Sequence, residues 1–230
     1  MFSGENSPEL TVAVNVQDVR KTYEGGVEAL RGVSLQLRAG EITALLGRSG
    51  CGKTTLLNLC GAMDFPTSGV IQVAGHVTTG LGDRQLTRLR REKIGFVFQF
   101  FQLLPTLTAI ENVELPLLLA GARNSMQTAR ERLEWVGLPE KAESLPWQLS
   151  GGQMQRVAIA RALAHTPAIL IADEPTGNLD TASGEVVLQL IRRAAREFGA
   201  AVAIATHSAE AAAIADIRIR MRDGLIESIE

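Results

Sequence analysis

Cysteine is scarce in this chain of 230 residues, where only Cys51 and Cys60 occur. Two cysteines cannot build a disulfide framework, so the sequence indicates a protein of a reducing compartment. Long apolar runs are also missing, and none approaches the ~20 residues that a membrane-spanning helix needs. Residues 1–8 are polar and lack the apolar core of a secretory signal. We therefore expect an intracellular protein that does not itself cross a membrane.

An excess of basic residues is absent as well, since 23 Lys and Arg stand against 25 Asp and Glu. This balance argues against a protein that binds nucleic acid over its whole surface. The basic run at residues 88–93 is interrupted by Glu92, and we interpret it as the solvated face of a helix. Hydrophobic residues, in contrast, make up 46% of the chain. This content excludes disorder over most of the chain and provides the core of one large domain.

Short runs that are apolar, or that alternate apolar and polar residues, are interspersed with helical patterns along the chain. The runs predict strands at residues 12–16, 33–37, 42–46, 70–73, 94–98, 168–172, 201–205 and 217–221. Helical periods predict a helical lobe at about residues 105–164, which prolines that include Pro116 interrupt. They also predict helices at residues 181–198 and 208–215. Asp223-Gly224 predicts a hairpin turn. We expect an α/β domain at residues 11–230 with a mostly parallel core sheet, after a flexible tail at residues 1–10.

A glycine-rich turn follows the strand predicted at residues 42–46. It fits the phosphate-binding pattern G-x-x-x-x-G-K-[ST] with the residues Gly47, Arg48, Ser49, Gly50, Cys51, Gly52, Lys53 and Thr54. Glycines allow backbone N–H groups to wrap a polyphosphate, and the helix that follows directs its positive end at the same anion. Lys53 would reach the β- and γ-phosphates, and the Thr54 hydroxyl would hold Mg²⁺. We interpret Cys51 as a small residue that fits the turn.

Two carboxylates follow the apolar strand predicted at residues 168–172. Asp173 at the strand end suits a Mg²⁺ ligand. Glu174, one residue further along, could orient and deprotonate an attacking water. Such a strand end is a weak signal alone, but behind a phosphate-binding loop it predicts nucleotide hydrolysis.

A second candidate anion site lies in the pentapeptide Leu149-Ser150-Gly151-Gly152-Gln153. Its serine and glycines precede a helix and offer a hydroxyl and free N–H groups at the positive helix end. With this pentapeptide, the loop and the acidic strand end in order, the sequence resembles the ABC ATPases over about residues 14–225. The resemblance implies the P-loop fold of that family, with an N-terminal antiparallel β region and an inserted helical lobe. It also implies a head-to-tail dimer, in which each ATP lies between the loop of one copy and the pentapeptide of the other.

Further site residues are implied by the same resemblance. The implied ATP-binding residues are Tyr23, which would stack on adenine, the loop residues from Gly47 to Thr54, Thr55, Ser150, Gly151, Gly152, Gln153 and Asp180. The implied catalytic residues are Lys53, Gln99, Glu174 and His207. The implied Mg²⁺ ligands are Thr54, Gln99 and Asp173.

One of these residues has an alternative nearby in the sequence, and another lies beside a departure from the family pattern. Gln99 would approach Mg²⁺ and sense a membrane partner, and Gln102 is a nearby competitor for that role. His207 would contact the γ-phosphate. Many family members have Asp immediately after this histidine, whereas this chain has Ser208. The departure affects the local support of His207 rather than its assignment.

Within the family, the stretches at residues 106–119 and 173–180 resemble the lipoprotein-release and macrolide-export branch. We therefore expect an ATPase subunit that couples closure of a homodimer to a membrane permease, at the cytoplasmic face of the cell membrane. The end of the chain soon after Gly224 predicts no C-terminal regulatory domain. An ATPase of an importer for small solutes, such as polar amino acids, is the alternative. A soluble, non-transport ABC ATPase is disfavoured by the single phosphate loop and the absence of Cys-x-x-Cys, and no nucleic-acid partner is expected.

Overall fold

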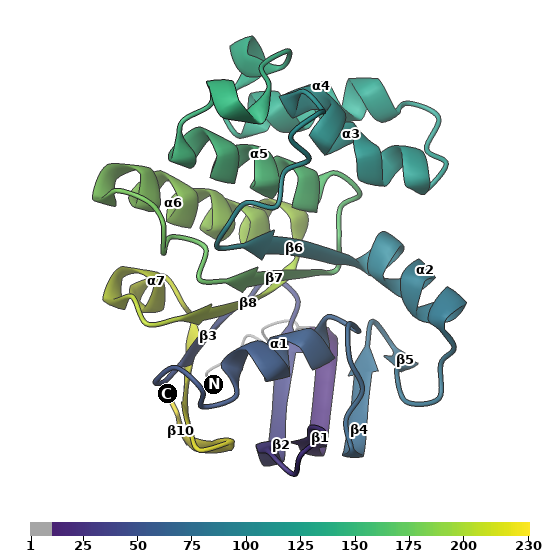
Figure 1. The fold of residues 1–230 in the computed structure, drawn as a ribbon, viewed down its shortest axis with the longest axis vertical. Coiled ribbons are helices and arrows are strands. Elements are labelled where there is room, and N and C mark those ends of the chain that lie inside the picture. Colours follow the sequence, from purple (N-terminus) through teal and green to yellow (C-terminus); the bar gives the residue numbers. More distant parts are fainter. Residues whose placement is uncertain (1–10) are drawn as a thin grey trace, which may run out of the picture.

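The computed structural model describes residues 11–230, so the predicted flexible tail lies outside the described residues. The first of two sheets is antiparallel and has the strand order β2-β1-β4-β5 (Figure 1). Its strands are β1 (Val12–Thr22), β2 (Glu28–Arg38), β4 (Ser68–Val73) and β5 (His76–Val77). This sheet is the expected N-terminal antiparallel β region.

The second sheet forms the centre of the molecule and has the strand order β10-β9-β3-β8-β7-β6. Its strands are β3 (Ile42–Leu46), β6 (Ile94–Phe98), β7 (Ile169–Asp173), β8 (Ala201–Thr206), β9 (Ile217–Arg222) and β10 (Leu225–Ile229). All neighbours pair in parallel except β9 and β10. Asp223 and Gly224 join these two with φ of 49° and 79°, as a two-residue hairpin requires. The expected mostly parallel core sheet and hairpin are confirmed.

Helices cover both faces of the central sheet (Figure 1). They are α1 (Lys53–Cys60), α2 (Asp83–Lys93), α3 (Ala109–Leu119), α4 (Ser125–Trp135), α5 (Gly151–Leu163), α6 (Thr181–Phe198) and α7 (Ala209–Ala213), with short 3-10 turns at Pro139–Lys141 and Pro146–Gln148. Helices α3, α4 and α5 form the helical lobe that the sequence predicts, between β6 and β7 in the chain. The basic run at residues 88–93 lies on α2, where Arg88 and Glu92 form an exposed ion pair, as expected of a solvated face.

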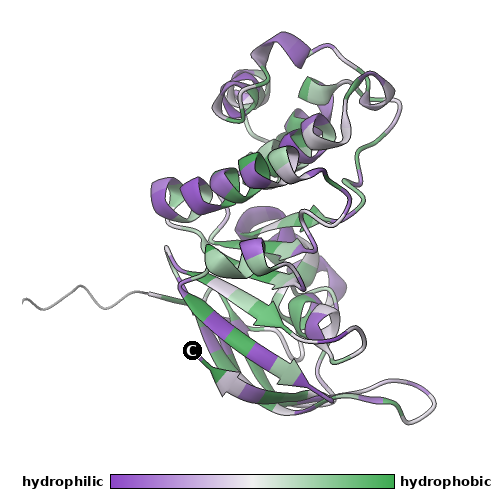
Figure 2. Ribbon diagram, turned by 90° about the vertical axis from the view of Figure 1, so that its left-hand side faces the viewer, coloured by the Kyte–Doolittle hydropathy of each residue, from purple (hydrophilic) through white to green (hydrophobic). Residues whose placement is uncertain are grey.

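The period-two alternation of the central strands divides the core into two layers. Ile169 and Ile171 of β7 pack in the layer that contains α1, α2 and the antiparallel sheet. Leu170 and Ala172 of the same strand pack in the layer of α3, α4, α5 and α6. A sheet buried on both faces requires apolar residues at every position, which explains the continuous apolar runs. Figure 2 shows strands inside the molecule that are mostly hydrophobic, and helices that carry both hydrophilic and hydrophobic residues.

The structure differs from the predicted elements where a local irregularity interrupts the pattern. Strand β1 continues to Thr22, because a bulge at Asp18, with φ of 44°, breaks the alternation after Val16 without ending the pairing. Pro116 does not separate two helices but lies inside α3. The helix ends at Leu119, where Gly121, with φ of 75°, and Ala122 donate hydrogen bonds back to the carbonyl oxygens of Leu118 and Leu117.

Candidate active site

The carboxyl ends of four parallel strands meet at one edge of the central sheet. Leu46 of β3 pairs with Thr206 of β8. Asp173 of β7 pairs with Ala205 of β8 on one side and with Phe98 of β6 on the other. The segments that follow these strands therefore converge where open parallel sheets bind ligands. They border a cavity of about 640 Å³, which is lined by Ala29, Gly47, Arg48, Ser49, Gly50, Gly52, Lys53, Thr54, Thr55, Gln99, Asp173, Glu174 and His207.

Two glycines allow the phosphate-binding loop to pass close to neighbouring strands. Gly47 and Gly52 have φ of 152° and 105°, in a region that favours glycine. A Cβ atom on Gly47 would lie 2.3 Å from the Met221 carbonyl oxygen, and one on Gly52 would lie 2.5 Å from the Ala29 carbonyl oxygen. No side chain fits at either position. The chain thus enters α1 directly after a tight turn, and the first N–H groups of the helix have no acceptor within it.

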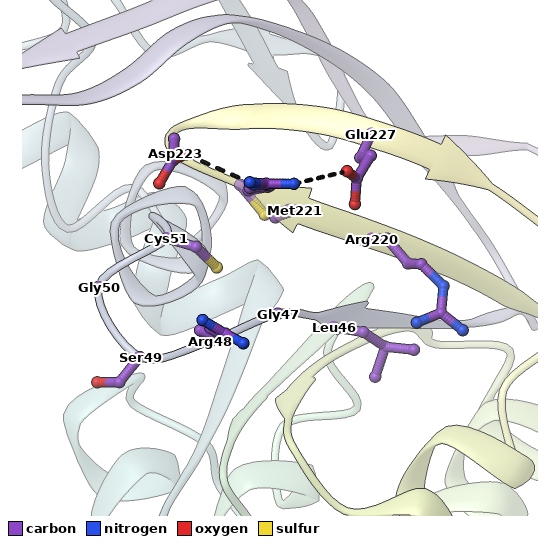
Figure 3. Close-up of a pocket in the computed structure, with 11 residues that line it drawn as sticks. Leu46, Gly47, Arg48, Ser49, Gly50, Cys51, Arg220, Met221, Asp223 and Glu227 are labelled. Carbon is purple, nitrogen blue, oxygen red and sulfur yellow. Dashed lines mark ion pairs between the residues drawn. The ribbon is translucent and has the colours of Figure 1, made fainter.

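A second cavity, of about 630 Å³, lies beside the same loop, against β9 and β10 (Figure 3). Arg48 borders both cavities, whereas Cys51 borders only this second one. Arg222 forms ion pairs there with Asp223, at 3.7 Å, and with Glu227, at 3.6 Å. The Cys51 side chain therefore does not face the first cavity, although Gly47, Arg48, Ser49 and Gly50 line both, which is consistent with a residue that only fits the turn.

Lys53 begins α1 and is almost completely buried. Its Nζ donates hydrogen bonds to the carbonyl oxygens of Gly47, at 2.7 Å, and Arg48, at 3.3 Å. The ammonium group is thus held inside the curve of the loop by carbonyl oxygens alone. An anion that enters the loop would meet a positive charge already positioned there.

Thr54 and Asp173 lie close together although 119 residues separate them in the chain. The Thr54 hydroxyl donates to Asp173 Oδ2 at 3.1 Å. Burial raises the pKa of Asp173, and the hydrogen bond from Thr54 opposes that shift. A hydroxyl and a carboxylate are oxygen donors of the kind that Mg²⁺ prefers, so these two residues fit the ion. Residues 11–230 contain no group of three His, Cys, Asp or Glu side chains that could hold a metal ion, so the ion would need further oxygen ligands such as phosphate, water or the amide oxygen of Gln99, which lines the same cavity.

The Glu174 carboxylate is held by the last residue of β8 and by the residue that follows this strand. His207 Nδ1 lies 2.9 Å from Glu174 Oε1, and the Thr206 hydroxyl donates to Glu174 Oε2 at 3.3 Å. Glu174 has φ of 46°, an unfavourable value for glutamate, and its N–H donates to the Ala205 carbonyl oxygen. Ser208 caps α7 by accepting a hydrogen bond from the Ala211 N–H, and its own N–H donates to Thr206. The departure at Ser208 therefore leaves the segment at His207 well anchored.

Gln99 follows β6 and lines the first cavity, whereas Gln102 does not. The Gln99 amide donates to Asn178 Oδ1 at 3.3 Å, and the Asn178 amide donates to the Gln99 carbonyl oxygen at 3.1 Å. Gly177 makes room for this pair, since a Cβ atom there would lie 2.9 Å from Gln99 Nε2. Of the two glutamines, only Gln99 is thus positioned toward the cavity.

The pentapeptide and Asp180 lie outside the first cavity. Ser150 caps α5 and forms a reciprocal pair of hydrogen bonds with Gln153, at 3.2 and 2.9 Å. Asp180 caps α6 by accepting hydrogen bonds from the Ser183 N–H and hydroxyl. A single chain therefore does not bring these predicted ATP-binding residues to the phosphate-binding loop.

Tyr23 lies just after β1, at the rim of the cavity. Its side chain is 40% exposed, and its hydroxyl lies 3.4 Å from the Thr55 hydroxyl, which does line the cavity. The Lys21 ammonium lies 4.9 Å from the centre of the Tyr23 ring. An exposed aromatic face at this rim is available for stacking.

Sequence reasoning missed two residues of this site. Ala29, on β2, closes the cavity from the antiparallel sheet, and no sequence signal marks it because its carbonyl group makes the contact with Gly52. Thr206 supports Glu174 and Ser208, and its place before His207 at a strand end was a signal that could have identified it.

Comparison with known proteins agrees with this geometry. Residues 30–177 match the family model described as ABC transporter. The chain belongs to the ABC transporter family. It is 49% identical over 221 residues to a macrolide export ATP-binding/permease protein, MacB, of Syntrophobacter fumaroxidans, covering 93% of this chain but only 31% of that protein. It is 46% identical over 217 residues to the lipoprotein-releasing system ATP-binding protein LolD of Gluconobacter oxydans, covering 92% of this chain and 94% of that one.

The family is also evident in solved structures. The ATP-binding cassette MJ0796 of Methanocaldococcus jannaschii, solved as a dimer in a post-hydrolysis state with ADP and Pi, superposes with a TM-score of 0.86 at 43% identity. That match covers 94% of this ABC ATPase and 97% of the cassette. The chain is thus an ATP-binding subunit of the ABC transporter type, from a family that hydrolyses ATP. No helix within residues 11–230 has both the length and the apolar character to span a membrane.

Proposed function

We propose that this chain is the ATPase subunit of a membrane complex of the lipoprotein-release or macrolide-export type, at the cytoplasmic face of the cell membrane. The observation that carries the proposal is the convergence of Lys53, Thr54, Asp173, Glu174 and His207 at one cavity. The similarity to LolD and MacB over more than nine-tenths of the chain supports this branch. The complex would use ATP hydrolysis to move a permease.

ATP binding would begin at the phosphate-binding loop. The N–H groups at the start of α1 and the Lys53 ammonium would bind the phosphates, and Tyr23 would stack on adenine. Lys53 would exchange the carbonyl oxygens of Gly47 and Arg48 for phosphate oxygens. Thr54 and Asp173 would hold Mg²⁺, with Gln99 nearby, and the bound ion would neutralise charge on the phosphates.

Hydrolysis would depend on the carboxylate of Glu174. The carboxylate would accept a proton from the attacking water and orient that water toward the γ-phosphate. Thr206 and His207 restrict the carboxylate to one position, so little reorganisation is needed during the reaction. His207 is largely exposed in the single chain and could turn toward the γ-phosphate.

A second copy of the chain would complete the site. Ser150 and the glycines that follow it form the positive end of α5 but lie outside the cavity of their own chain. In a head-to-tail homodimer, these groups would bind the γ-phosphate held by the partner's loop. The dimer of MJ0796 with ADP and Pi is consistent with this arrangement. Neither copy could surround the nucleotide alone, so ATP would close the dimer.

The membrane partner would bind an apolar groove between the central sheet and the helical lobe. This groove, of about 330 Å³, is lined mainly by apolar residues of β6, α3 and α5, including Phe96, Leu115 and Leu119. Leu118 and Leu119 are 55% and 62% exposed, which leaves apolar surface without a partner in the chain. We infer that a helix at the cytoplasmic end of the permease occupies the groove, next to the segment that follows Gln99.

Capture of the permease tests this function. Tagged Glu174→Gln protein would be mixed with detergent-solubilised native membranes and ATP, and bound membrane proteins would be identified by mass spectrometry. We expect a permease with few spans and a large extracytoplasmic domain. A many-spanned permease with a solute-binding protein would instead assign the chain to an importer. Recovery of soluble partners without any permease would contradict a role in transport.

A matched pair of variants makes the capture specific to the groove. Leu119→Glu places a charge in the apolar groove and should reduce permease recovery about tenfold or more, because the carboxylate would lose its water when an apolar helix docks there. Val77→Glu, at an exposed position on β5 in the antiparallel sheet, is the control and should leave recovery unchanged. Equal recovery with both variants would exclude the groove as the docking surface.

Stacking by Tyr23 is tested by a series of substitutions. Tyr23→Ala should weaken ATP binding about five- to hundredfold, because stacking of a base on an aromatic ring contributes about 1–3 kcal/mol. Tyr23→Phe and Tyr23→Trp should bind ATP nearly as well as the native chain, since both keep an aromatic face. Calorimetric titration gives the affinities. Equal affinities across the series would show that Tyr23 does not stack on the nucleotide.

A further inference from the structure

Helix α5 holds the polypeptide immediately before Gln99. Gln155 on this helix is completely buried, and its amide Nε2 donates to the Phe98 carbonyl oxygen at 3.2 Å. The same Nε2 donates to the Pro175 carbonyl oxygen at 2.7 Å. Phe98 precedes Gln99 and Pro175 follows Glu174. One side chain therefore connects the helix to the backbone beside both residues.

The same helix also holds the polypeptide just after Gln99. The Arg161 guanidinium donates to the Phe101 carbonyl oxygen at 2.9 Å and to the Gln102 carbonyl oxygen. Phe101 and Gln102 have backbone φ angles of 59° and 51°, values that residues other than glycine rarely adopt. Two successive residues in this conformation need external support, and the guanidinium supplies it.

The charge of Arg161 strengthens this contact. Within residues 11–230, no Asp or Glu side chain forms an ion pair with Arg161, so its charge is stabilised by the two carbonyl oxygens. Burial lowers the pKa of Arg161, which reflects the poor access of water to the group. A cation that has lost water depends on its remaining acceptors. Displacement of the turn at Phe101 and Gln102 would therefore be opposed by the helix.

We propose that Gln155 and Arg161 are positioning residues that make Gln99 move together with α5. The first turn of α5 carries Ser150, Gly151 and Gly152, so the helix joins the surface proposed to bind the partner's nucleotide to the segment that carries Gln99. Arg161 also borders the apolar groove proposed for the permease. The inference rests on the proposed function for its catalytic consequence, although the mechanical connection itself does not depend on ATP. Movement of the helical lobe would thereby change the distance of Gln99 from the cavity.

Hydrogen exchange tests the mechanical connection in the ligand-free chain. The amides of Phe101, Gln102 and Leu104 are hydrogen-bonded in the structure, so exchange in a peptide covering residues 98–104 reports on the turn. Arg161→Ala should accelerate its exchange about tenfold or more, because local opening becomes easier. Gln155→Met keeps the buried volume and removes an oxygen that has no hydrogen-bond partner, so the variant should fold and still accelerate exchange.

Arg156 on the same helix provides a matched control. Its guanidinium donates to the carbonyl oxygens of Val136 and Gly137, after α4, and within residues 11–230 it makes no hydrogen bond to residues 98–104. Arg156→Ala should accelerate exchange around residues 133–138 and leave residues 98–104 unchanged. Unchanged exchange at residues 98–104 in both Arg161→Ala and Gln155→Met would overturn the proposal.

Turnover distinguishes positioning from a loss of stability. Arg161→Ala should lower kcat about tenfold or more with KM for ATP within about threefold, because small displacements of a catalytic group are costly. Arg156→Ala, which loses the same number of contacts, should change kcat less than about twofold. Equal losses of kcat in the two variants would contradict the positioning role of Arg161. Unchanged turnover in both Lys53→Ala and Glu174→Gln would contradict the proposed ATPase site. The hydrogen-exchange rates of residues 98–104 would still test whether this segment is held by α5.

Discussion

Replacement of Glu174 by glutamine is expected to lower ATP turnover by about 10²- to 10⁴-fold, the range that general-base catalysis contributes. Glutamine keeps the size of the side chain and can still pair with Thr206 and His207, but its amide does not accept a proton from water. ATP binding should therefore be retained. Because hydrolysis would no longer reopen the dimer, the variant should accumulate as an ATP-dependent dimer. Steady-state phosphate release and size-exclusion chromatography with light scattering measure the two effects.

Glu210 is a suitable control for this substitution. It is an exposed glutamate in the same region, and its carboxylate accepts a hydrogen bond from Ser208 rather than binding at the cavity. Glu210→Gln should leave turnover within about twofold of the native value, since surface substitutions usually have small effects. Unchanged turnover in purified Glu174→Gln protein would disprove the general-base assignment.

Replacement of Lys53 by alanine is expected to weaken ATP binding itself. A hydrogen bond to a charged group contributes about 1.5–3 kcal/mol, which corresponds to an affinity loss of about ten- to hundredfold. The substitution also removes the two hydrogen bonds to Gly47 and Arg48 that hold the loop in its curve. Calorimetric titration with ATP and Mg²⁺ gives the affinity.

Two further variants separate loss of charge from loss of structure. Lys53→Met keeps a long apolar side chain in the nearly buried space and removes the charge, so it should also weaken ATP binding. Lys93→Ala removes an exposed lysine at the end of α2 and should bind ATP like the native chain. An unchanged affinity in both Lys53 variants, with the chains folded, would count against the role of the loop.

Strands and helices were predictable where one period dominates the sequence. The strands at residues 42–46 and 94–98 and the helix at residues 181–198 have the predicted bounds, because each is continuously buried or strongly amphipathic. The predictions were less accurate where a local irregularity interrupts the period. The bulge at Asp18 conceals the second half of β1, and Pro116 lies inside α3 although it reads as a boundary.

The residues that line the candidate cavity could be identified from the sequence because a phosphate-binding loop of the proposed kind depends largely on backbone groups. A tight turn followed by a helix requires glycines at fixed spacing, so the residues of the loop remain contiguous and recognisable. The two acidic residues at the end of β7 are also adjacent in the sequence, so they could be recognised in the same way. Thr206 was not predicted, because a threonine at a strand end has several ordinary roles and only its partner distinguishes them. Ala29 contributes through its carbonyl oxygen, which every residue has.

The sequence by itself determined the chemical groups, their order along the chain and the family, because these follow from local spacing. Only the tertiary structure decided which groups meet. Thr54 and Asp173 are joined by the register of β3, β8 and β7, and Gln155 and Arg161 reach both sides of Gln99 because α5 packs along β6. The tertiary structure also placed Ser150 outside the cavity of its own chain. Such contacts join segments far apart in the chain and arise from packing of the whole core, which no local pattern encodes.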